Sequence, residues 1–397
     1  MTTNKNHNSP NVPNSTDKGN VIRNVPALRF PEFEGEWKKE QLGDTADFSK
    51  GAGISKEQLS EKGEPCILYG ELYTKYKSEV IYDIISKTDI DSTKLVRSQA
   101  NDVIIPSSGE TAEDIATARC VLKNNILLGG DLNIIRLHNH SGSFMSYQLN
   151  GKRKYDIAKV AQGVSVVHLY AEHLKGVNTY NPCMEEQEKI ARLLSLLDER
   201  IATQNKIIED LKKLKSAISE RLFKSVKGSI VLLSNICDIV KGKQINGENL
   251  SERGRYYVMN GGTEPSGYYD DYNVEANTIS ISEGGNSCGY VQFNTFPFWS
   301  GGHCYSIQNV TGNVDNLYLY HYLKSKEDAI MKLRIGSGLP NIQKKDLAIF
   351  KIKLPTFEQQ KIISTFLSSL ERKTQIEADI LIAMQSEKQH LLRQMFI

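Results

Sequence analysis

The chain has 397 residues, of which 39% are hydrophobic and 24% are charged, and its formal net charge at pH 7 is +2. This composition is typical of a soluble globular protein with two or three domains, and the small net charge excludes a uniformly basic surface. No apolar stretch approaches the roughly 18 residues of a membrane span, so we expect a cytoplasmic protein. The six cysteines contain no C-x-x-C pair, which predicts reduced thiols and neither a disulfide framework nor a zinc site.

The first part of the chain is expected to be a polar arm followed by a mixed α/β domain. Residues 1–20 are rich in Asn, Ser, Thr and Lys and contain no apolar core, so we expect a disordered arm. Residues 21–183 alternate short apolar runs with Gly, Pro and Ser, a pattern typical of strands and turns. The expected strands include residues 103–105, 126–128 and 134–137, and helices are expected around residues 56–62 and 144–161.

A long helix is predicted over residues 184–227. Its apolar residues follow a spacing of three and four that is interrupted only by Gln204 and Lys215. Forty helical residues would extend roughly 60 Å. The apolar positions are Ile190, Leu194, Leu197, Ile201, Ile208, Leu211, Ile218 and Leu222.

A second domain is expected over residues 228–355, followed by a C-terminal helix over residues 356–397. The C-terminal segment has a similar but less regular apolar stripe, and we expect it to pair antiparallel with the central helix. That pairing would give the molecule an internal pseudo-twofold axis. The stripe consists of Ile363, Phe366, Leu370, Ile380, Met384 and Leu391.

The two domains are copies of one another. Residues 42–51, which begin Leu-Gly-Asp and end Lys-Gly, return at an offset of 191 as residues 233–242. Near the end of each domain, residues 163–174 match residues 336–347 at an offset of 173, so the first domain has about 18 extra residues in its middle. A repeat of this length indicates duplicated domains and not solenoid units.

In both halves, these motifs resemble those of the specificity subunit of type I restriction-modification systems. Each half has the Leu-x-(Asp/Asn) beginning, the Gly-rich segment before Leu174 or Leu347, and the helix opening Glu-Gln-x-Lys-Ile after Pro182 or Pro355. In the first half the Gly-rich segment lacks the Pro and Asn of Pro340-Asn341. The order of domain, helix, domain and helix makes the resemblance specific.

This resemblance implies an α+β protein with two target recognition domains, each of which recognises one half of a split site in double-stranded DNA. The two long helices would act as a molecular ruler. Two methyltransferase (modification) subunits with S-adenosylmethionine would methylate adenine, and restriction/translocase subunits with ATP and Mg²⁺ would cleave. The chain itself would bind none of these cofactors and would carry no catalytic residue.

The candidate DNA contacts are polar residues in loops, because Lys and Arg contact phosphates and polar side chains contact base edges. A simple turn, or for residues 152–154 a solvated helix face, is the alternative for each. The candidates in the first domain are Lys50, Tyr69, Glu71, Ser107, Ser108, Glu110, Thr111, Lys152, Arg153 and Lys154. Those in the second are Lys241, Asn260, Thr263, Ser282, Glu283, Asn286, Arg334, Lys344 and Lys345.

Three apolar residues of the central segment, Leu196, Ile207 and Leu214, lie off the main stripe. They are candidates for docking partner subunits, with contact to the chain's own domains as the alternative.

Two other classes of function remain open: a stand-alone DNA-modifying enzyme and a coiled-coil scaffold with two protein-binding heads. Against the enzyme, residues 181–184 (Asn-Pro-Cys-Met) lack the second proline and the aromatic residue of the adenine methyltransferase loop, and no phosphate-binding glycine loop is found.

Overall fold

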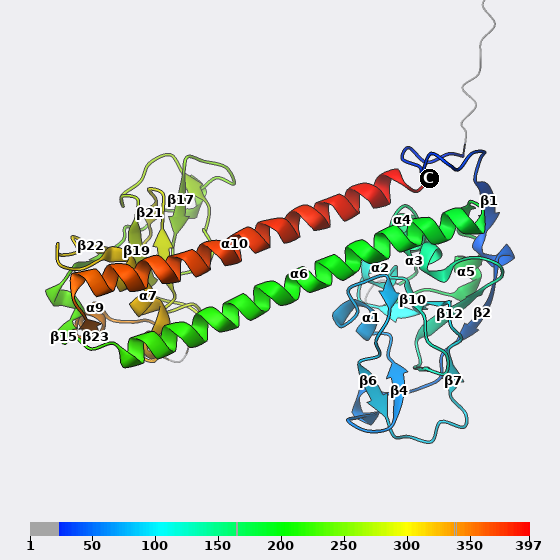
Figure 1. Cartoon of the computed structure of the whole chain (residues 1–397), viewed down its shortest axis with the longest axis horizontal. Helices are drawn as coiled ribbons and strands as arrows, with labels where there is room; N and C mark the ends of the chain where they lie inside the picture. The colour runs from blue at the N-terminus through cyan, green and yellow to red at the C-terminus, as the bar shows by residue number, and fades with distance from the viewer. Residues whose placement is uncertain (1–23, 164–165, 337, 339) are drawn as a thin grey trace, which may run out of the picture. The chain divides into compact units, whose positions relative to one another are not determined.

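The structure is a computed structural model that describes residues 24–163, 166–336, 338 and 340–397. The predicted polar arm, residues 1–20, lies outside the described residues. The chain divides into two compact units (Figure 1). Unit 1 contains the described residues up to 201 together with residues 383–397, and unit 2 contains residues 202–382. None of the described helices has the length and apolarity that crossing a membrane requires.

Unit 1 is built on two mixed sheets. The strands of the first are, in order, β2 (Ala46–Lys50), β12 (Leu132–Leu137), β8 (Asp102–Pro106), β10 (Arg119–Val121) and β5 (Val80–Ile81). Those of the second are β3 (Leu59–Ser60), β6 (Ser86–Thr88), β4 (Glu64–Ile67), β11 (Leu127–Leu128) and β7 (Val96–Arg97). Two further pairs join β1 (Lys38–Gln41) to β14 (Asn178–Asn181), and β9 (Ser108–Gly109) to β13 (Val167–His168).

The helices of unit 1 are short. They are α1 (Glu71–Thr74), α2 (Ala112–Ile115), α3 (Gly142–Asn150), α4 (Lys154–Val160) and α5 (Ala171–Lys175). The helix expected over residues 144–161 is therefore confirmed as two helices, α3 and α4. The helix expected over residues 56–62 is wrong: a single 3-10 turn, Lys56–Gln58, is followed directly by β3, because Leu59 and Ser60 pair with β6.

Unit 2 repeats this topology in reduced form. Its main sheet has the order β16 (Asp238–Lys241), β22 (Cys304–Gln308), β19 (Thr278–Ser282) and β20 (Val291–Asn294). A smaller sheet has the order β18 (Tyr268–Tyr269), β17 (Tyr256–Met259) and β21 (Trp299–Ser300), and β15 (Ser229–Leu232) pairs with β23 (Lys351–Leu354). Its short helices are α7 (Asn316–Ser325), α8 (Glu327–Met331) and α9 (Lys344–Ala348).

The two smaller sheets correct the sequence alignment by one residue. Ile67 pairs in parallel with Leu128, and Met259 pairs in parallel with Ser300, which occupies the position of Leu128 in the repeat. Met259 is therefore the counterpart of Ile67, at an offset of 192 instead of 191. Asn260 then corresponds to Leu68, so the sequence placed the loop after this strand one position out of register.

Two long helices, α6 (Met184–Ser225) and α10 (Phe357–Gln394), contribute to both units (Figure 1). Within unit 2 they pair antiparallel, because Gln204 donates to the Glu377 carboxylate at 2.6 Å while Lys215, further along α6, donates to Glu371 at 2.7 Å. Gln204 and Lys215 are the two residues that interrupt the apolar stripe in the sequence. Their positions are thus part of the pairing surface, and polar residues at such positions fix the register of paired helices.

The stripe predicted for the C-terminal helix is wrong at two positions. Phe366 is 44% exposed and Ile380 is 39% exposed, whereas Leu367 is fully buried. Ile363 is half-buried and packs against the core of unit 2, so the side of α10 that packs inward includes Ile363 and Leu367.

Each unit is closed by a phenylalanine at the end of a long helix. In unit 1, Phe396 follows α10 and packs against Phe144 and Trp37, with ring centroids 5.2 and 6.3 Å away. In unit 2, Phe223 of α6 packs against Tyr318 and Tyr322 at 5.6 and 5.3 Å. The two phenylalanines are 173 residues apart and both are buried. The duplication therefore extends to the way in which each core is completed.

A polar contact is duplicated in the same way. In unit 1, Asp198 of α6 accepts from the Tyr147 hydroxyl at 2.7 Å and forms an ion pair with Lys388 of α10 at 2.6 Å. In unit 2, Glu371 of α10 accepts from the Tyr320 hydroxyl at 3.0 Å and from Lys215 of α6 at 2.7 Å. The carboxylate, the lysine and the tyrosine of one unit are each separated by 173 positions in the sequence from their counterpart in the other unit. We call the two sets the carboxylate locks.

The two locks differ in burial. Lys388 also pairs with Glu79, and the side chains of Lys388, Glu79 and Asp198 are only 10%, 11% and 6% exposed. Burial raises the pKa of Glu79, while Lys388 acts in the opposite direction. Lys215 and Glu371 are 22% and 43% exposed, so water screens the second lock much more.

Replacing Lys388 with Met should destabilise the protein by about 3 kcal/mol, because two buried carboxylates lose their cation. Lys215→Met is the matched control, for which we expect about 1 kcal/mol or less. Urea unfolding at neutral pH measures both. Equal losses for the two variants would contradict a buried lock in unit 1.

Candidate nucleic-acid interface

In unit 1, four loops are tied together by backbone hydrogen bonds. After β2, Gly51 donates to the carbonyl of Leu132 at 3.0 Å and Ala52 donates to that of Leu128, also at 3.0 Å. After β8, Ser107 donates to the carbonyl of Asp131 at 2.7 Å and accepts from Leu169 at 3.0 Å. The loops after β2 and β8, the loop at residues 128–131 and the segment at β13 therefore meet at one edge of the sheet. We call this set of bonds the loop scaffold.

Unit 2 contains the same loop scaffold. Gly242 donates to Cys304 at 2.9 Å and Lys243 to Ser300 at 2.8 Å. Glu283 donates to the carbonyl of His303 at 2.8 Å and accepts from Ile342 at 2.9 Å. The correspondence of residues 128–131 with residues 300–303, predicted from sequence, is confirmed. Ser107 and Glu283 occupy equivalent positions, as do Asp131 and His303, so one scaffold presents different side chains in the two units.

Glycine is required where these loops touch. A Cβ atom at Gly51 would lie 1.9 Å from the Gly129 carbonyl oxygen, and one at Gly242 would lie 2.2 Å from the Gly301 carbonyl oxygen. These distances are far below van der Waals contact with backbone that cannot move aside independently. The Lys-Gly pairs at the ends of β2 and β16 therefore hold Lys50 and Lys241 at the scaffold.

The scaffold of unit 2 has a charged cluster at its centre. Lys241 contacts the Glu283 carboxylate at 2.7 Å, and the Tyr305 hydroxyl lies 3.1 Å from the same oxygen. Burial and the Glu283 charge raise the pKa of Tyr305, so its hydroxyl remains protonated. The second Glu283 oxygen is buried without a hydrogen bond, and the exposed His303 ring is 3.9 Å from it. Glu283 is thus left with one free acceptor, which a rotated His303 could satisfy.

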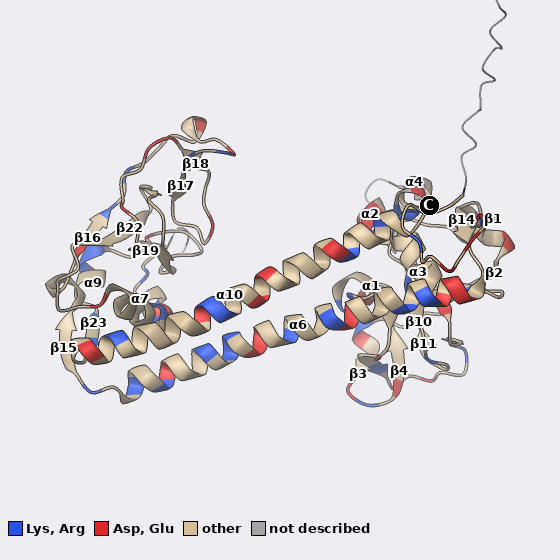
Figure 2. Ribbon diagram, turned by 45° about the horizontal axis from the view of Figure 1, so that its top comes forward, with Lys and Arg blue, Asp and Glu red and all other residues tan. Residues whose placement is uncertain are grey.

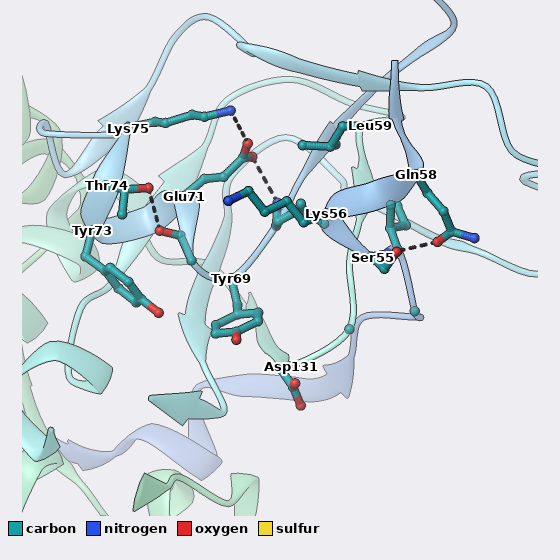
Figure 3. Close-up of a pocket in the computed structure, with 15 residues that line it drawn as sticks. Ser55, Lys56, Gln58, Leu59, Tyr69, Glu71, Tyr73, Thr74, Lys75 and Asp131 are labelled. Atoms are coloured by element: carbon teal, nitrogen blue, oxygen red, sulfur yellow. Dashed lines mark hydrogen bonds and ion pairs between the residues drawn. The ribbon is translucent and has the colours of Figure 1, made fainter. Parts of the chain in front are cut away.

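The scaffold of unit 1 is beside a pocket instead. The pocket has a volume of about 850 Å³ and is lined by residues of the loop after β2, of α1 and of the loop at residues 130–131. Figure 3 shows Tyr69 and Tyr73 next to each other, with Lys56 and Asp131 among the other residues that line it. Tyr69 and Glu71 were candidates from sequence.

Several predicted DNA contacts are exposed, as a contact requires. The exposed candidates are Lys50, Glu110, Thr111, Lys152, Lys241, Thr263, Asn286, Arg334, Lys344 and Lys345. Tyr69, Ser108, Lys154 and Asn260 are half-buried. Thr111 also caps α2, since its hydroxyl accepts from the Asp114 amide at 3.1 Å.

The structure argues against direct base contact by four candidates that are buried, namely Glu71, Ser107, Ser282 and Glu283. Glu71 accepts from Lys75 at 2.6 Å and from the Leu68 amide at 3.1 Å, so its carboxylate is occupied. The Ser282 hydroxyl donates to the Gly261 carbonyl at 2.8 Å. The side chains of Glu71 and Ser282 thus hold neighbouring backbone in the loops, whereas Ser107 does so through its own backbone.

Arg153 also has a structural role. Its guanidinium donates to the Ile397 carbonyl at 3.0 Å, pairs with Asp156 at 3.1 Å and lies 5.4 Å from the Tyr180 ring centre. The positive cluster expected at residues 152–154 is therefore reduced to Lys152 and the half-buried Lys154.

Charge along the long helices is mixed. Figure 2 shows Lys and Arg interspersed with Asp and Glu on α6 and α10. The docking candidates on α6 are exposed, with Leu196, Ile207 and Leu214 at 46%, 39% and 50%. Within the described ranges, no group of three or more His, Cys, Asp or Glu side chains is arranged to hold a metal ion.

Sequence reasoning missed four residues of these sites: Lys56, Tyr73, Asp131 and His303. Asp131 and His303 could have been found, because each follows the repeated Gly-Gly pair at a position where the copies differ. Lys56 and Tyr73 could not, because no repeated motif places them beside the scaffold.

Two copies of one loop scaffold, completed by shared long helices, define a duplicated binding protein. Residues 34–213 and 229–385 match the family described as the type I restriction modification DNA specificity domain. The chain belongs to this family, which confirms the identification made from the motifs.

The similar proteins include specificity subunits that match over different lengths. The type I restriction enzyme MjaVIII specificity subunit of Methanocaldococcus jannaschii is 24% identical over 400 residues, which cover 90% of each chain. The putative type I specificity subunit S.MpnORF638P of Mycoplasma pneumoniae is 33% identical over 138 residues, 34% of this chain. The match spans only 36% of that relative, and 39% of a putative specificity subunit from Mycoplasma genitalium.

Two solved structures share the fold. The S subunit of a type I restriction-modification system from M. genitalium has a TM-score of 0.68 and 20% identity, with coverage of 94% of this chain and 99% of that one. A chain from a structure on the assembly and conformational transition of a type I system has a TM-score of 0.56 and 16% identity, with coverage of 91% and 97%. The predicted class, mixed α/β domains with long helices, is confirmed.

Replacing Gly242 with Ala should separate the loop after β16 from Gly301 and destabilise the protein by about 1–3 kcal/mol. Gly247→Ala is the control, because a Cβ there meets nothing within 4 Å. Chemical unfolding compares the two, and equal stability would contradict the close contact between the loops.

Proposed function

We propose that this chain is the non-catalytic specificity subunit of a type I restriction-modification complex. Each unit recognises one half of a split site in double-stranded DNA. Partner subunits supply the chemistry: two modification subunits methylate adenine with S-adenosylmethionine, and restriction subunits use ATP and Mg²⁺. Family membership supports the class of function, and the loop scaffold supports the division of labour between the units.

The observation that carries this proposal is the loop scaffold with different side chains at equivalent positions. Ser107 and Asp131 in unit 1 correspond to Glu283 and His303 in unit 2, on the same set of backbone hydrogen bonds. A duplicated binding protein with two unlike surfaces suits a ligand with two unlike half-sites. An asymmetric split DNA site is such a ligand.

Lys50 and Lys241 are proposed as symmetric phosphate contacts. Both end a strand at the scaffold, both precede the required glycine and both are exposed. Lys241 pairs with Glu283, so a phosphate must compete for it, whereas the structure gives Lys50 no ion pair among the described residues. Such contacts give affinity that falls steeply with salt, while neighbouring polar groups contact bases.

The exposed apolar residues of the long helices are proposed to dock the modification subunits. Leu193 and Ile207 on α6 are 36% and 39% exposed, and the residues 173 positions later on α10, Phe366 and Ile380, are 44% and 39% exposed. The same apolar pair therefore occurs once in each copy of the repeat. Two copies of one partner could therefore bind two similar surfaces. On α6, the exposed Leu196 and Leu214 enlarge this apolar surface.

Exchanging residues 228–355 for the equivalent segment of a family member with another target should change one half of the methylated site. The other half should remain, because unit 1 keeps its own loops. The assembled complex is given S-adenosylmethionine and DNA, and modified adenines are mapped by sequencing.

The same assay on the chain alone is the control, and we expect no methylation. A change in both half-sites would contradict independent recognition. Methylation by the chain alone would contradict the assignment of catalysis to partners.

Lengthening both long helices should lengthen the spacer between half-sites. Four residues are inserted after Asn205 and four after Gln375, so that the Gln204–Glu377 and Lys215–Glu371 contacts both keep their partners. The insertion adds ~6 Å of helix, which at ~3.4 Å per base pair predicts one or two additional base pairs. Inserting four residues after Asn205 alone is the matched control, which breaks the register. An unchanged spacer with both insertions would contradict the ruler.

A further inference from the structure

The pocket of unit 1 is a feature that the proposed function leaves unexplained. Its volume of about 850 Å³ is in the range of sites that enclose small organic groups. The apolar part of its wall comes from Ile54, Leu59 and Leu68, and the aromatic part from Tyr69 and Tyr73. It could therefore enclose a planar ring together with the sugar attached to it.

The pocket is built where the two units differ. Gly70 and Gly262 are equivalent after the one-residue correction. The next residues that the strand pairing shows to be equivalent are Val103 in β8 and Ile279 in β19, because they pair with Ile135 and Ile307. The intervening segment has 32 residues in unit 1 and 16 in unit 2. Helix α1, with Tyr73, Thr74 and Lys75 in the pocket wall, belongs to this longer segment. The pocket thus belongs to the part of unit 1 that has no counterpart of equal length in unit 2.

Four polar groups in the pocket wall are available to a ligand. Among the described residues, Lys56, Tyr69, Tyr73 and Asp131 have no side-chain hydrogen bond or ion pair, in contrast to Glu71 and Lys75, which bind each other. Burial raises the pKa of Tyr73, so its hydroxyl is a donor at neutral pH. Lys56 and the tyrosines supply donors and Asp131 supplies an acceptor, around two aromatic faces (Figure 3).

That combination matches a nucleobase, which has flat faces for stacking and an edge with both donors and acceptors. Aromatic side chains stack on unpaired bases of any sequence, and polar groups then select among them. A base within a duplex offers only its groove edge and could not enter an enclosed pocket. Enzymes that enclose a base first rotate it out of the duplex.

We propose that the pocket between Ser55–Leu59, α1 and Asp131 takes up one nucleobase of the first half-site, rotated out of the duplex. This inference rests on the proposed function, because it needs DNA at the scaffold. The pocket shares its walls with that scaffold: Gly53 follows Gly51, and Asp131 accepts from Ser107. DNA held by Lys50 and the scaffold loops would have one backbone beside the opening of the pocket.

A base that leaves the duplex binds more tightly when its pairing partner is missing, because unpairing is then less costly. The assembled complex is titrated with duplexes in which each base opposite the first half-site is replaced, in turn, by an abasic residue. The modification subunits also rotate out the adenine that they methylate. Besides the position opposite that adenine, we therefore expect one further position at which the abasic partner raises affinity several-fold. In Tyr73→Ala and in Tyr69→Ala, that gain should be lost and affinity for the intact site should fall about tenfold.

Tyr155→Ala is the matched control, since Tyr155 is 75% exposed on α4 outside the pocket, and the gain should persist in it. Recognition of the second half-site, measured in the same complexes, reports that each variant is folded. If wild type binds its site but no further abasic position raises affinity, or if the gain at that position survives in both pocket variants, the uptake of a base is refuted and DNA recognition stands. If the complex binds no specific DNA, both proposals fall.

Discussion

Neither unit is complete without the end of a helix that leaves the other domain. Phe396 fills the core of unit 1 between Phe144 and Trp37, and Phe223 fills that of unit 2 between Tyr318 and Tyr322. The carboxylate locks add a polar contact to each of these junctions. Burial of such large aromatic side chains is a major stabilising term. Each unit therefore completes its own core with residues of a long helix that also contributes to the other unit.

Polar residues between α6 and α10 lower the stability of the helix pair but fix the register in which the two helices pack. Gln204 and Lys215 occupy positions that an apolar side chain would fill more favourably, yet each has one partner on α10. A shift of one helical turn would leave the buried Gln204 amide and the partly buried Lys215 ammonium without these partners. The buried carboxylate lock of unit 1 restricts the register of the two helices more strictly than the half-exposed lock of unit 2.

Periodicity and duplication made most of the fold predictable, because both depend on patterns that the sequence displays directly. The central helix begins and ends within three residues of the prediction, and the strands at residues 103–105 and 134–137 lie inside β8 and β12. Tertiary contacts decided what patterns could not. Strand pairing shows that Met259, and not Val258, is the counterpart of Ile67. The helix openings are corrected in the same way: Gln187 and Gln360 each donate to the carbonyl of the proline five residues earlier. These two glutamines are therefore equivalent, although matching the Glu-Gln-x-Lys-Ile motifs would pair Gln187 with Gln359. Burial of Glu71 and Ser107 was likewise invisible, because polar loop residues look alike in sequence whether they contact solvent or hold a neighbouring loop.

The loop scaffold combines positions that admit no side chain with positions at which the two units carry different side chains. Gly51 and Gly242 admit no side chain, and the backbone bonds of residues 107 and 283 do not depend on side-chain identity, so these positions preserve the edge of the sheet while its chemistry varies. Ser107 can become a glutamate and Asp131 a histidine without breaking any of these bonds. The two units differ most in the segment that follows Gly70 in unit 1 and Gly262 in unit 2. In unit 1 this segment contains α1 and the pocket, and in unit 2 it is a shorter connection that contains β18. A duplicated gene could thus diverge into two unlike readers by altering loops alone, while the helices and the phenylalanines that close each core stayed under a common constraint.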